Sequence, residues 1–202
     1  MKEKETIMAL QLTKGSKIAL EKENHSGVKL TKIYVGLGWD IKPEAISGAD
    51  FDLDASAFLL RADGKAHGSQ NVVYYNNKIG VNESVVAGDD NRTGSGDGDD
   101  ESIIVDLTKL PDDIHKVMFT VTIHEAAERG QNFGQVRNAY IRVVNTDNDQ
   151  ELLRYDLSED FSTDTGIIVG SIYRHNNEFK FEAAGQGYKQ GLGAIADAYL
   201  VD

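Results

Sequence analysis

The chain has 202 residues, 40% of them hydrophobic, which suits one globular domain with a sizeable core. Its formal net charge of −12 argues against nucleic acid or an anionic membrane as the main partner, because an acidic surface repels both. It has no cysteine, which excludes disulfides, thiolate zinc sites and cysteine nucleophiles.

Segments rich in β-branched and aromatic residues follow one another along the chain, separated by clusters of Gly, Asn and Asp. This pattern is typical of short strands joined by turns. The predicted strands are 10–15 and 16–21, which form an opening pair, then 32–39, 51–60, 71–75, 102–107, 116–123, 139–145, 151–157, 165–175 and 178–184. We therefore expect an all-β fold, a two-sheet antiparallel β-sandwich, although the sequence alone does not exclude a barrel.

Two helical pieces are expected among the strands. The first is a short turn or helix within 123–134. The second is a C-terminal helix within 187–202, where Tyr188, Leu192, Ile195 and Tyr199 fall on one helical stripe. Glycines in this last segment lower its helix propensity by about 1 kcal/mol each relative to Ala.

The segment 50–60 places carboxylates on one face of a predicted strand. Alternation puts Asp52 and Asp54 on one side and Phe51, Leu53 and Ala55 on the other. The acidic face becomes apolar further along, so the strand begins at a polar rim and then enters the core. Like charges facing one another destabilise a strand, and a bound cation would reverse that effect.

The loop 88–101, GDDNRTGSGDGDDE, holds six acidic side chains and one arginine. Its glycines allow the backbone to wrap, and its carboxylates, amide and hydroxyls are hard oxygen ligands. Calcium takes 6–8 such ligands in flexible geometry, so the loop favours calcium over magnesium. The competing interpretation is an extended, solvated loop with its charges apart.

Other motifs predict less. An EF-hand starting at Asp90 fails, because Arg92 and Gly94 stand where side-chain oxygens are needed. HEAAE at 124–128 resembles a zinc-protease helix that has lost its second histidine. The glycines of VGLGWD at 35–40 are interpreted as a strand end, from which Asp40 can join the acidic rim.

Several short motifs together resemble the TerD family of tellurite-resistance and stress-response proteins. They are VGLGWD, DFDLDASAFLL, DNRTGSGDGDDE, FGQV, RYDLSED, YRHN and GQGY. Their order and spacing hold over about residues 8–200. The resemblance implies a calcium-binding β-sandwich without known catalysis, with two adjacent calcium ions as its cofactors. It also implies an extension at 1–7 and a single domain at 8–202, because the family starts near Met8.

The resemblance also implies the ligands and the partners. The family's acidic motif positions, taken as metal-binding residues, correspond to Asp40, Asp52, Asp54, Asp90, Asn91, Asp97, Asp99, Asp100 and Glu101. Expected partners are other proteins of tellurite-resistance operons, including an integral membrane protein. Neither nucleic acid binding nor direct membrane insertion is expected.

The first ten residues hold no apolar stretch, so we expect no signal peptide, and no apolar run is long enough to span a membrane. The expected location is the cytoplasm, with peripheral attachment to the inner membrane face through a partner. Two other function classes stay open: a calcium-dependent, lectin-like carbohydrate-binding module and a metal-dependent hydrolase.

Overall fold

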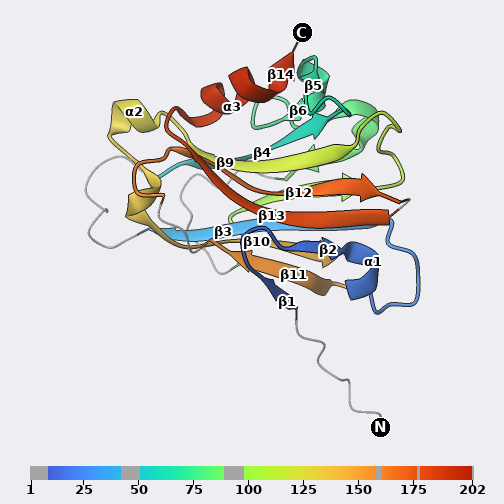
Figure 1. Ribbon diagram of the computed structural model, residues 1–202. Coiled ribbons are helices and arrows are strands. Elements are labelled where there is room, and N and C mark those ends of the chain that lie inside the picture. The colour runs from blue at the N-terminus through green and yellow to red at the C-terminus, as the bar shows by residue number, and fades with distance from the viewer. Residues whose placement is uncertain (1–8, 42–50, 89–97, 158–160, 177, 202) are drawn as a thin grey trace.

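The computed structural model describes residues 9–41, 51–88, 98–157, 161–176 and 178–201. Its strands form two sheets that face each other as the layers of a sandwich (Figure 1). Sheet A contains, in spatial order, β1 (Leu10–Leu12), β11 (Gln150–Asp156), β10 (Val136–Asn145), β3 (Lys32–Ile41), β8 (Glu101–Asp106) and β7 (Val85–Ala87). Sheet B contains β2 (Lys17–Ala19), β13 (Glu178–Tyr188), β12 (Gly166–His175), β9 (Lys116–Ile123), β4 (Leu53–Leu60) and β6 (Val72–Val73). The predicted β-sandwich is confirmed.

The opening strands do not pair with each other, so that prediction is wrong. Strand β1 adds to β11 of sheet A in parallel, whereas β2 adds to β13 of sheet B antiparallel. The chain turns between them at Gly15, whose φ of 81° is the left-handed backbone that glycine adopts readily. This turn carries the chain from one layer to the other instead of folding it into a hairpin.

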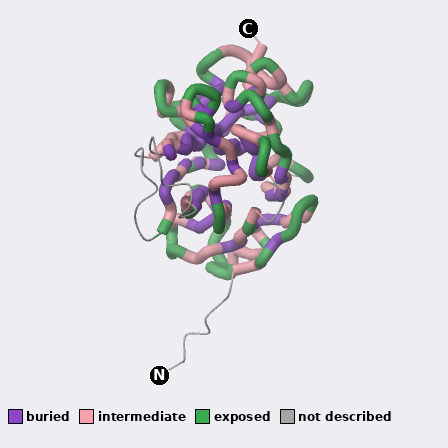
Figure 2. The backbone as a smooth tube through the Cα atoms, turned by 90° about the vertical axis from the view of Figure 1, so that its left-hand side faces the viewer, coloured by how far each residue is buried: buried purple, intermediate pink, exposed green. Residues whose placement is uncertain are grey.

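The alternation predicted for 51–60 is what places β4. Leu53, Ala55 and Leu59 face the core between the two sheets, and Phe58 and Leu60 face the opposite way into a second apolar cluster. All eight residues of β4 are buried, and Figure 2 shows that buried residues are concentrated in the centre of the molecule. The strand is covered on both faces, as the change from acidic to apolar on its outer side predicts.

Three short helices complete the described part of the chain: α1 (Leu20–Glu23), α2 (Ala126–Arg129) and α3 (Gly191–Tyr199). Single 3-10 turns lie at Ser69–Asn71, Val81–Glu83 and Phe133–Gln135, and β14 (Leu200–Val201) pairs in parallel with β5 (Ala66–His67). Helix α3 lies on the outer side of sheet B (Figure 1). Its Leu192, Ile195 and Tyr199 pack on the second apolar cluster, which confirms the predicted stripe, although Tyr188 belongs to β13.

The predicted strand at 71–75 is shorter than expected. Only Val72 and Val73 belong to β6, because the chain turns back at once: Tyr74 N–H donates to the Asn77 carbonyl at 3.0 Å, and the Asn77 N–H donates to Tyr74 at 2.9 Å. This turn brings Tyr75 close to the beginning of β4, where its ring meets that of His124.

Candidate functional site

The predicted ligands that the structure describes come from one end of the sandwich, where β3 ends and β4 and β8 begin. Glu101 of β8 pairs with Leu37 of β3, and the Asp100 N–H donates to the Leu37 carbonyl at 2.8 Å. Strand β4 approaches β8 across the sandwich, and residues of β3 and β4 together line a small internal cavity. The structure thus brings Asp40, Asp52, Asp54, Asp99, Asp100 and Glu101 to this acidic end. The other predicted ligands, Asp90, Asn91 and Asp97, lie outside the described residues.

Asp100 is a buried carboxylate among like charges. Only 7% of the residue is exposed, and its Oδ2 accepts a hydrogen bond of 2.9 Å from the Trp39 N–H. Burial raises the pKa of Asp100, the Trp39 hydrogen bond partly opposes this, and the negative charges of Asp40 and Asp99 raise the pKa further. The ionised form of Asp100 is therefore less favourable here than it is in water.

This environment predicts that Asp100→Asn stabilises the metal-free protein by about 1 kcal/mol, since the amide oxygen can still accept from Trp39 while the buried charge is removed. Urea unfolding in a chelator measures the change. Asp112→Asn, an exposed acid at the opposite end, is the control and should change little. A loss of stability in Asp100→Asn would contradict the prediction.

The neighbouring acids are also withdrawn from solvent. Asp54 is 7% exposed and Glu101 is 8% exposed. Asp52 Oδ1 is buried and accepts no hydrogen bond from the described part of the chain, while the Asp52 carbonyl accepts from His124 N–H at 2.8 Å. A buried carboxylate oxygen left without a partner costs more than the usual 1–3 kcal/mol for a polar group, so this oxygen indicates a missing positive partner.

Asp99 is held differently, by a positively charged side chain of the sheet. The Arg142 guanidinium donates to Asp99 Oδ1 from Nε at 2.9 Å and to Oδ2 from Nη2 at 2.8 Å, and Tyr140 Oη donates to Oδ1 at 2.8 Å. Only 2% of the Asp99 side chain is exposed. Because its charge is already neutralised, Asp99 acts in this structure as an anchor for the start of β8, and its predicted role as a metal ligand stays a prediction.

Two glycines make room for this anchor. A Cβ on Gly36 would overlap the Asp99 carboxylate, and a Cβ on Gly38 would lie 2.5 Å from the Tyr140 ring. Burial and the Asp99 carboxylate raise the pKa of Tyr140, so the phenol stays protonated and remains a donor. The guanidinium of Arg154 lies over the Tyr140 ring, with its Cζ 3.6 Å from the ring centroid. The glycines of 35–40 therefore form the seat of Asp99, which is more than a strand end.

Asp40 lies at the exposed side of the acidic end. Its Oδ2 accepts a hydrogen bond of 2.7 Å from Asn138 Nδ2. Asn138 has a φ of 52° and sits where the pairing of β10 with β3 shifts register between Arg137 and Tyr140. This bulge turns the amide towards Asp40.

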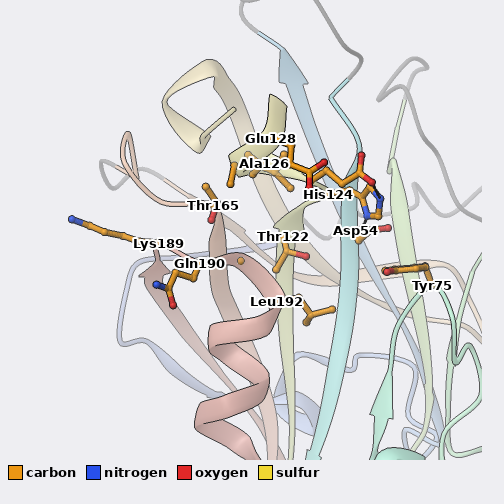
Figure 3. Close-up of a pocket in the computed structure, with 14 residues that line it drawn as sticks. Asp54, Tyr75, Thr122, His124, Ala126, Glu128, Thr165, Lys189, Gln190 and Leu192 are labelled. Atoms are coloured by element: carbon orange, nitrogen blue, oxygen red, sulfur yellow. Dashed lines mark ion pairs between the residues drawn. The ribbon is translucent and has the colours of Figure 1, made fainter. Parts of the chain in front are cut away.

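Asp54 lines a pocket of about 460 Å³ between β4, β9 and the beginning of α3 (Figure 3). It is the cross-strand partner of Thr122, and its Oδ2 lies 3.6 Å from His124 Nδ1. The Tyr75 ring meets the His124 ring edge to face, with centroids 5.6 Å apart. Glu125 and Glu128 add two more carboxylates to the lining, so the pocket extends the acidic end over the outer face of sheet B.

The segment 124–128 begins the short helix predicted there. Glu125 has a φ of 51° and precedes α2, and its carboxylate accepts from Arg129 Nη2 at 2.8 Å. Within the ranges that the structure describes, no three His, Asp or Glu side chains are arranged to hold a metal ion.

Sequence reasoning missed the residues that hold Asp99. In AYIRVV, Tyr140 and Arg142 are two positions apart and therefore lie on the same face of a strand, which was the available signal.

A model of the TerD domain matches residues 8–199 of this chain. The chain belongs to the TerD family. General stress protein 16U of Bacillus subtilis is 50% identical over 192 residues, covering 95% of this chain and 97% of that protein. Tellurium resistance protein TerD of Serratia marcescens is 48% identical over 195 residues, covering 96% and 99%. The resemblance inferred from the motifs is confirmed.

A solved structure supports the fold of this TerD-family chain. A homologue of telluride resistance protein (TerD) from Streptomyces coelicolor A3(2) superposes with a TM-score of 0.66 at 24% identity, covering 83% of this chain and 96% of that one. At this identity the likeness shows the fold alone. No helix in the described part of the chain is long and apolar enough to cross a membrane.

The described side chains at the acidic end of the TerD domain are of the ligand type that calcium binds. Its described side chains are hard carboxylate oxygens, several of them buried, and one has no hydrogen-bond donor. Calcium accepts 6–8 oxygens at irregular angles and suits such a set, whereas Asp99 is already occupied by Arg142. The donor chemistry of Asp52, Asp54, Asp100 and Glu101 therefore suits calcium, although the described side chains alone do not form a complete set of ligands around one point.

Proposed function

We propose that this TerD-family protein is a calcium-binding, non-catalytic stress-response protein. The observation that carries the proposal is the buried Oδ1 of Asp52. It has no hydrogen-bond partner among the described residues and lies at the end of the sandwich that also holds Asp54, Asp100 and Glu101. Relatives named for general stress and for tellurium resistance support the stress-response part.

The chain's own residues supply a partly formed site. The Asp99–Arg142 ion pair fixes the start of β8, and the Trp39 N–H fixes the Asp100 carboxylate. Calcium would neutralise the carboxylates, and the acidic loop 88–101 would complete its coordination with Asp90, Asn91 and Asp97. Two adjacent ions would share these ligands. The ordered loop would then form a surface for other proteins.

The partners that we propose are proteins of tellurite-resistance operons, including an integral membrane protein that would hold this chain at the inner membrane face. Resistance would then be indirect, through assembly or signalling. With no cysteine, the chain lacks the soft thiolate ligand that direct capture of tellurium would favour.

Calorimetric titration of the metal-free protein tests the calcium part, with magnesium as the competitor. We expect calcium to bind preferentially and to stabilise the fold by about 2.7 kcal/mol at a hundredfold excess over the dissociation constant. For a domain of this size that is a rise in Tm of roughly 5–10 °C. Magnesium should compete poorly, because it demands a regular octahedron and keeps its waters.

Two variants locate the site. Asp52→Asn removes the unpartnered carboxylate and should weaken calcium binding at least tenfold, while Asp112→Asn removes an equal charge at the opposite end and should leave binding unchanged. Equal losses in both would mean that calcium responds only to the overall negative charge. The absence of any calcium-dependent shift in Tm would refute the proposed function.

A further inference from the structure

A second pocket, on the outer face of sheet B, carries the opposite charge from the acidic end. It has a volume of about 570 Å³, within the usual range for small-molecule sites. Arg61, Lys116, His115 and Arg174 line it, against the single carboxylate of Glu182, and the Arg174 guanidinium is turned away towards the Leu110 and Ile114 carbonyls. We call this the basic pocket. In a chain of net charge −12, such a concentration of positive charge is unexpected from composition.

The cations come together because neighbouring strands place them in adjacent rows. Lys116 pairs with Leu60 of β4 on one side and with Tyr173 of β12 on the other. Arg61 follows Leu60 directly, and the Arg174 N–H donates to the His115 carbonyl at 2.9 Å. The positive charges are thus fixed by the register of sheet B.

The positively charged side chains differ in how firmly they are held. Arg174 is rigid, because its guanidinium donates to the Leu110 and Ile114 carbonyls at 2.8 and 3.2 Å and lies 4.9 Å from the Phe179 ring. Lys116 Nζ lies 3.6 Å from Glu182 Oε2 and 5.8 Å from the Tyr173 ring centroid.

Two carboxylates lie next to these cations. Glu182 is shared between two lysines, and Asp113 is exposed to solvent. Glu182 Oε1 also meets Lys17 Nζ at 3.2 Å, so one carboxylate faces two ammonium groups. Arg61 pairs with Asp113 at 3.0 Å, with both side chains largely in solvent, where such a pair is weak. The local charge therefore stays positive and leaves Lys116 and Arg61 able to bind an anion.

The floor of the basic pocket is apolar. Leu60, Met118 and Ile168 belong to the second apolar cluster, and Tyr199 of α3 forms one side. Helix α3 ends there, and the negative end of its dipole is offset by Lys65, whose Nζ donates to the Ala198 carbonyl. A ligand that fits must combine an anionic group with a flat apolar part.

We propose that the basic pocket binds a small organic phosphate that carries an aromatic ring, of the nucleoside monophosphate class. The phosphate lies against Arg61 and Lys116, and the ring packs over Met118 beside Tyr173. Arg and Lys suit phosphate oxygens, and tyrosine rings provide flat apolar contact. This site is separate from the acidic end and does not depend on calcium.

The test is a titration of the isotope-labelled full chain with adenosine monophosphate, inorganic phosphate and adenosine, followed by amide NMR shifts in chelator and again in calcium. We expect adenosine monophosphate to shift residues at the beginning of β9 and in β12, more tightly than either fragment alone, and more weakly as salt is added. Equal affinity for inorganic phosphate would overturn the role of the ring, and equal affinity for adenosine would overturn the role of the cations.

Charge-removing variants place the ligand. Lys116→Gln and Arg61→Gln should each lower the affinity about tenfold, as expected for a hydrogen bond to a charged group. Lys22→Gln removes the same charge from the exposed helix α1 and should have no effect. A matching loss in Lys22→Gln, or no shifts at millimolar adenosine monophosphate, would show that the basic pocket is not a site for this class of ligand.

Discussion

Replacing Arg142 by Gln is expected to destabilise the protein by about 2–3 kcal/mol. Breaking a buried ion pair typically costs 3–5 kcal/mol, and the value is lower here because 31% of the Arg142 side chain is in contact with solvent. The loss arises because Asp99, 2% exposed, keeps its charge without its main donor. Thermal unfolding should show a Tm lower by roughly 5–10 °C.

A double-mutant cycle isolates the pair. Asp99→Asn and Arg142→Gln should each destabilise the fold, and the double variant should lose clearly less than the sum, with a coupling of about 1.5–3 kcal/mol. Arg137→Gln, an exposed arginine on the same strand, should change stability by less than about 0.5 kcal/mol. A coupling near zero would mean that the ion pair does not hold β8.

The same cycle separates anchoring from metal binding. If Asp99 anchors β8, Asp99→Asn should weaken calcium binding less than Asp52→Asn does. Exchanging the charges in the double variant Asp99→Arg with Arg142→Asp should recover part of the lost stability. An arginine cannot act as a calcium ligand, so recovered stability together with retained calcium binding would support anchoring alone.

Replacing Gly36 by Ala should be similarly damaging, at about 2–4 kcal/mol. The added methyl group would occupy the place of the Asp99 carboxylate, which four hydrogen bonds from Arg142 and Tyr140 hold in position. Displacing Asp99 would break these bonds together. Chemical denaturation measures the change in the free energy of unfolding.

The control is the same Gly36→Ala substitution made in a variant that lacks the Asp99 carboxylate. In Asp99→Ala the space over Gly36 is free, and Gly36→Ala should then be neutral or stabilising, because alanine costs less backbone entropy in a strand. Gly193→Ala, where a Cβ meets nothing within 4 Å, should stabilise α3 by up to about 1 kcal/mol. A Gly36→Ala penalty that is equally large without Asp99 would place the clash elsewhere.

The fold could be predicted from the sequence where the residue pattern of a single strand shows which of its faces are buried. Along β4, Leu53, Ala55 and Leu59 alternate with residues that face outward, and the change at Phe58 already indicates a cover on that side. The pairing of β1 and β2 could not be predicted, because both strands are short and their partners lie more than 130 residues away. Proximity in the sequence favours a hairpin, whereas the turn at Gly15 sends the chain to the other sheet.

The sequence identified which acidic residues belong to the acidic end, but it could not predict the separate role of each one. Carboxylate spacing identifies Asp52 and Asp54, and nothing in it distinguishes Asp99, held by Arg142, from Asp100, buried beside Trp39. These roles depend on which residues of β3 and β10 lie beside each side chain at the start of β8. The basic pocket was missed for the same reason, since Arg61 and Lys116 are brought to one pocket only by strand register.

The positions of β1 and β2 at the edges of separate sheets constrain the order of events during synthesis. Their partners are Leu153–Tyr155 of β11 and Lys180–Glu182 of β13, so the first strands to leave the ribosome are paired only when most of the chain has emerged. Until then their backbone donors and acceptors stay available to other chains. Completion of the sandwich at the amino end is therefore a late, long-range step, of the kind that slows folding and makes a nascent chain dependent on chaperones.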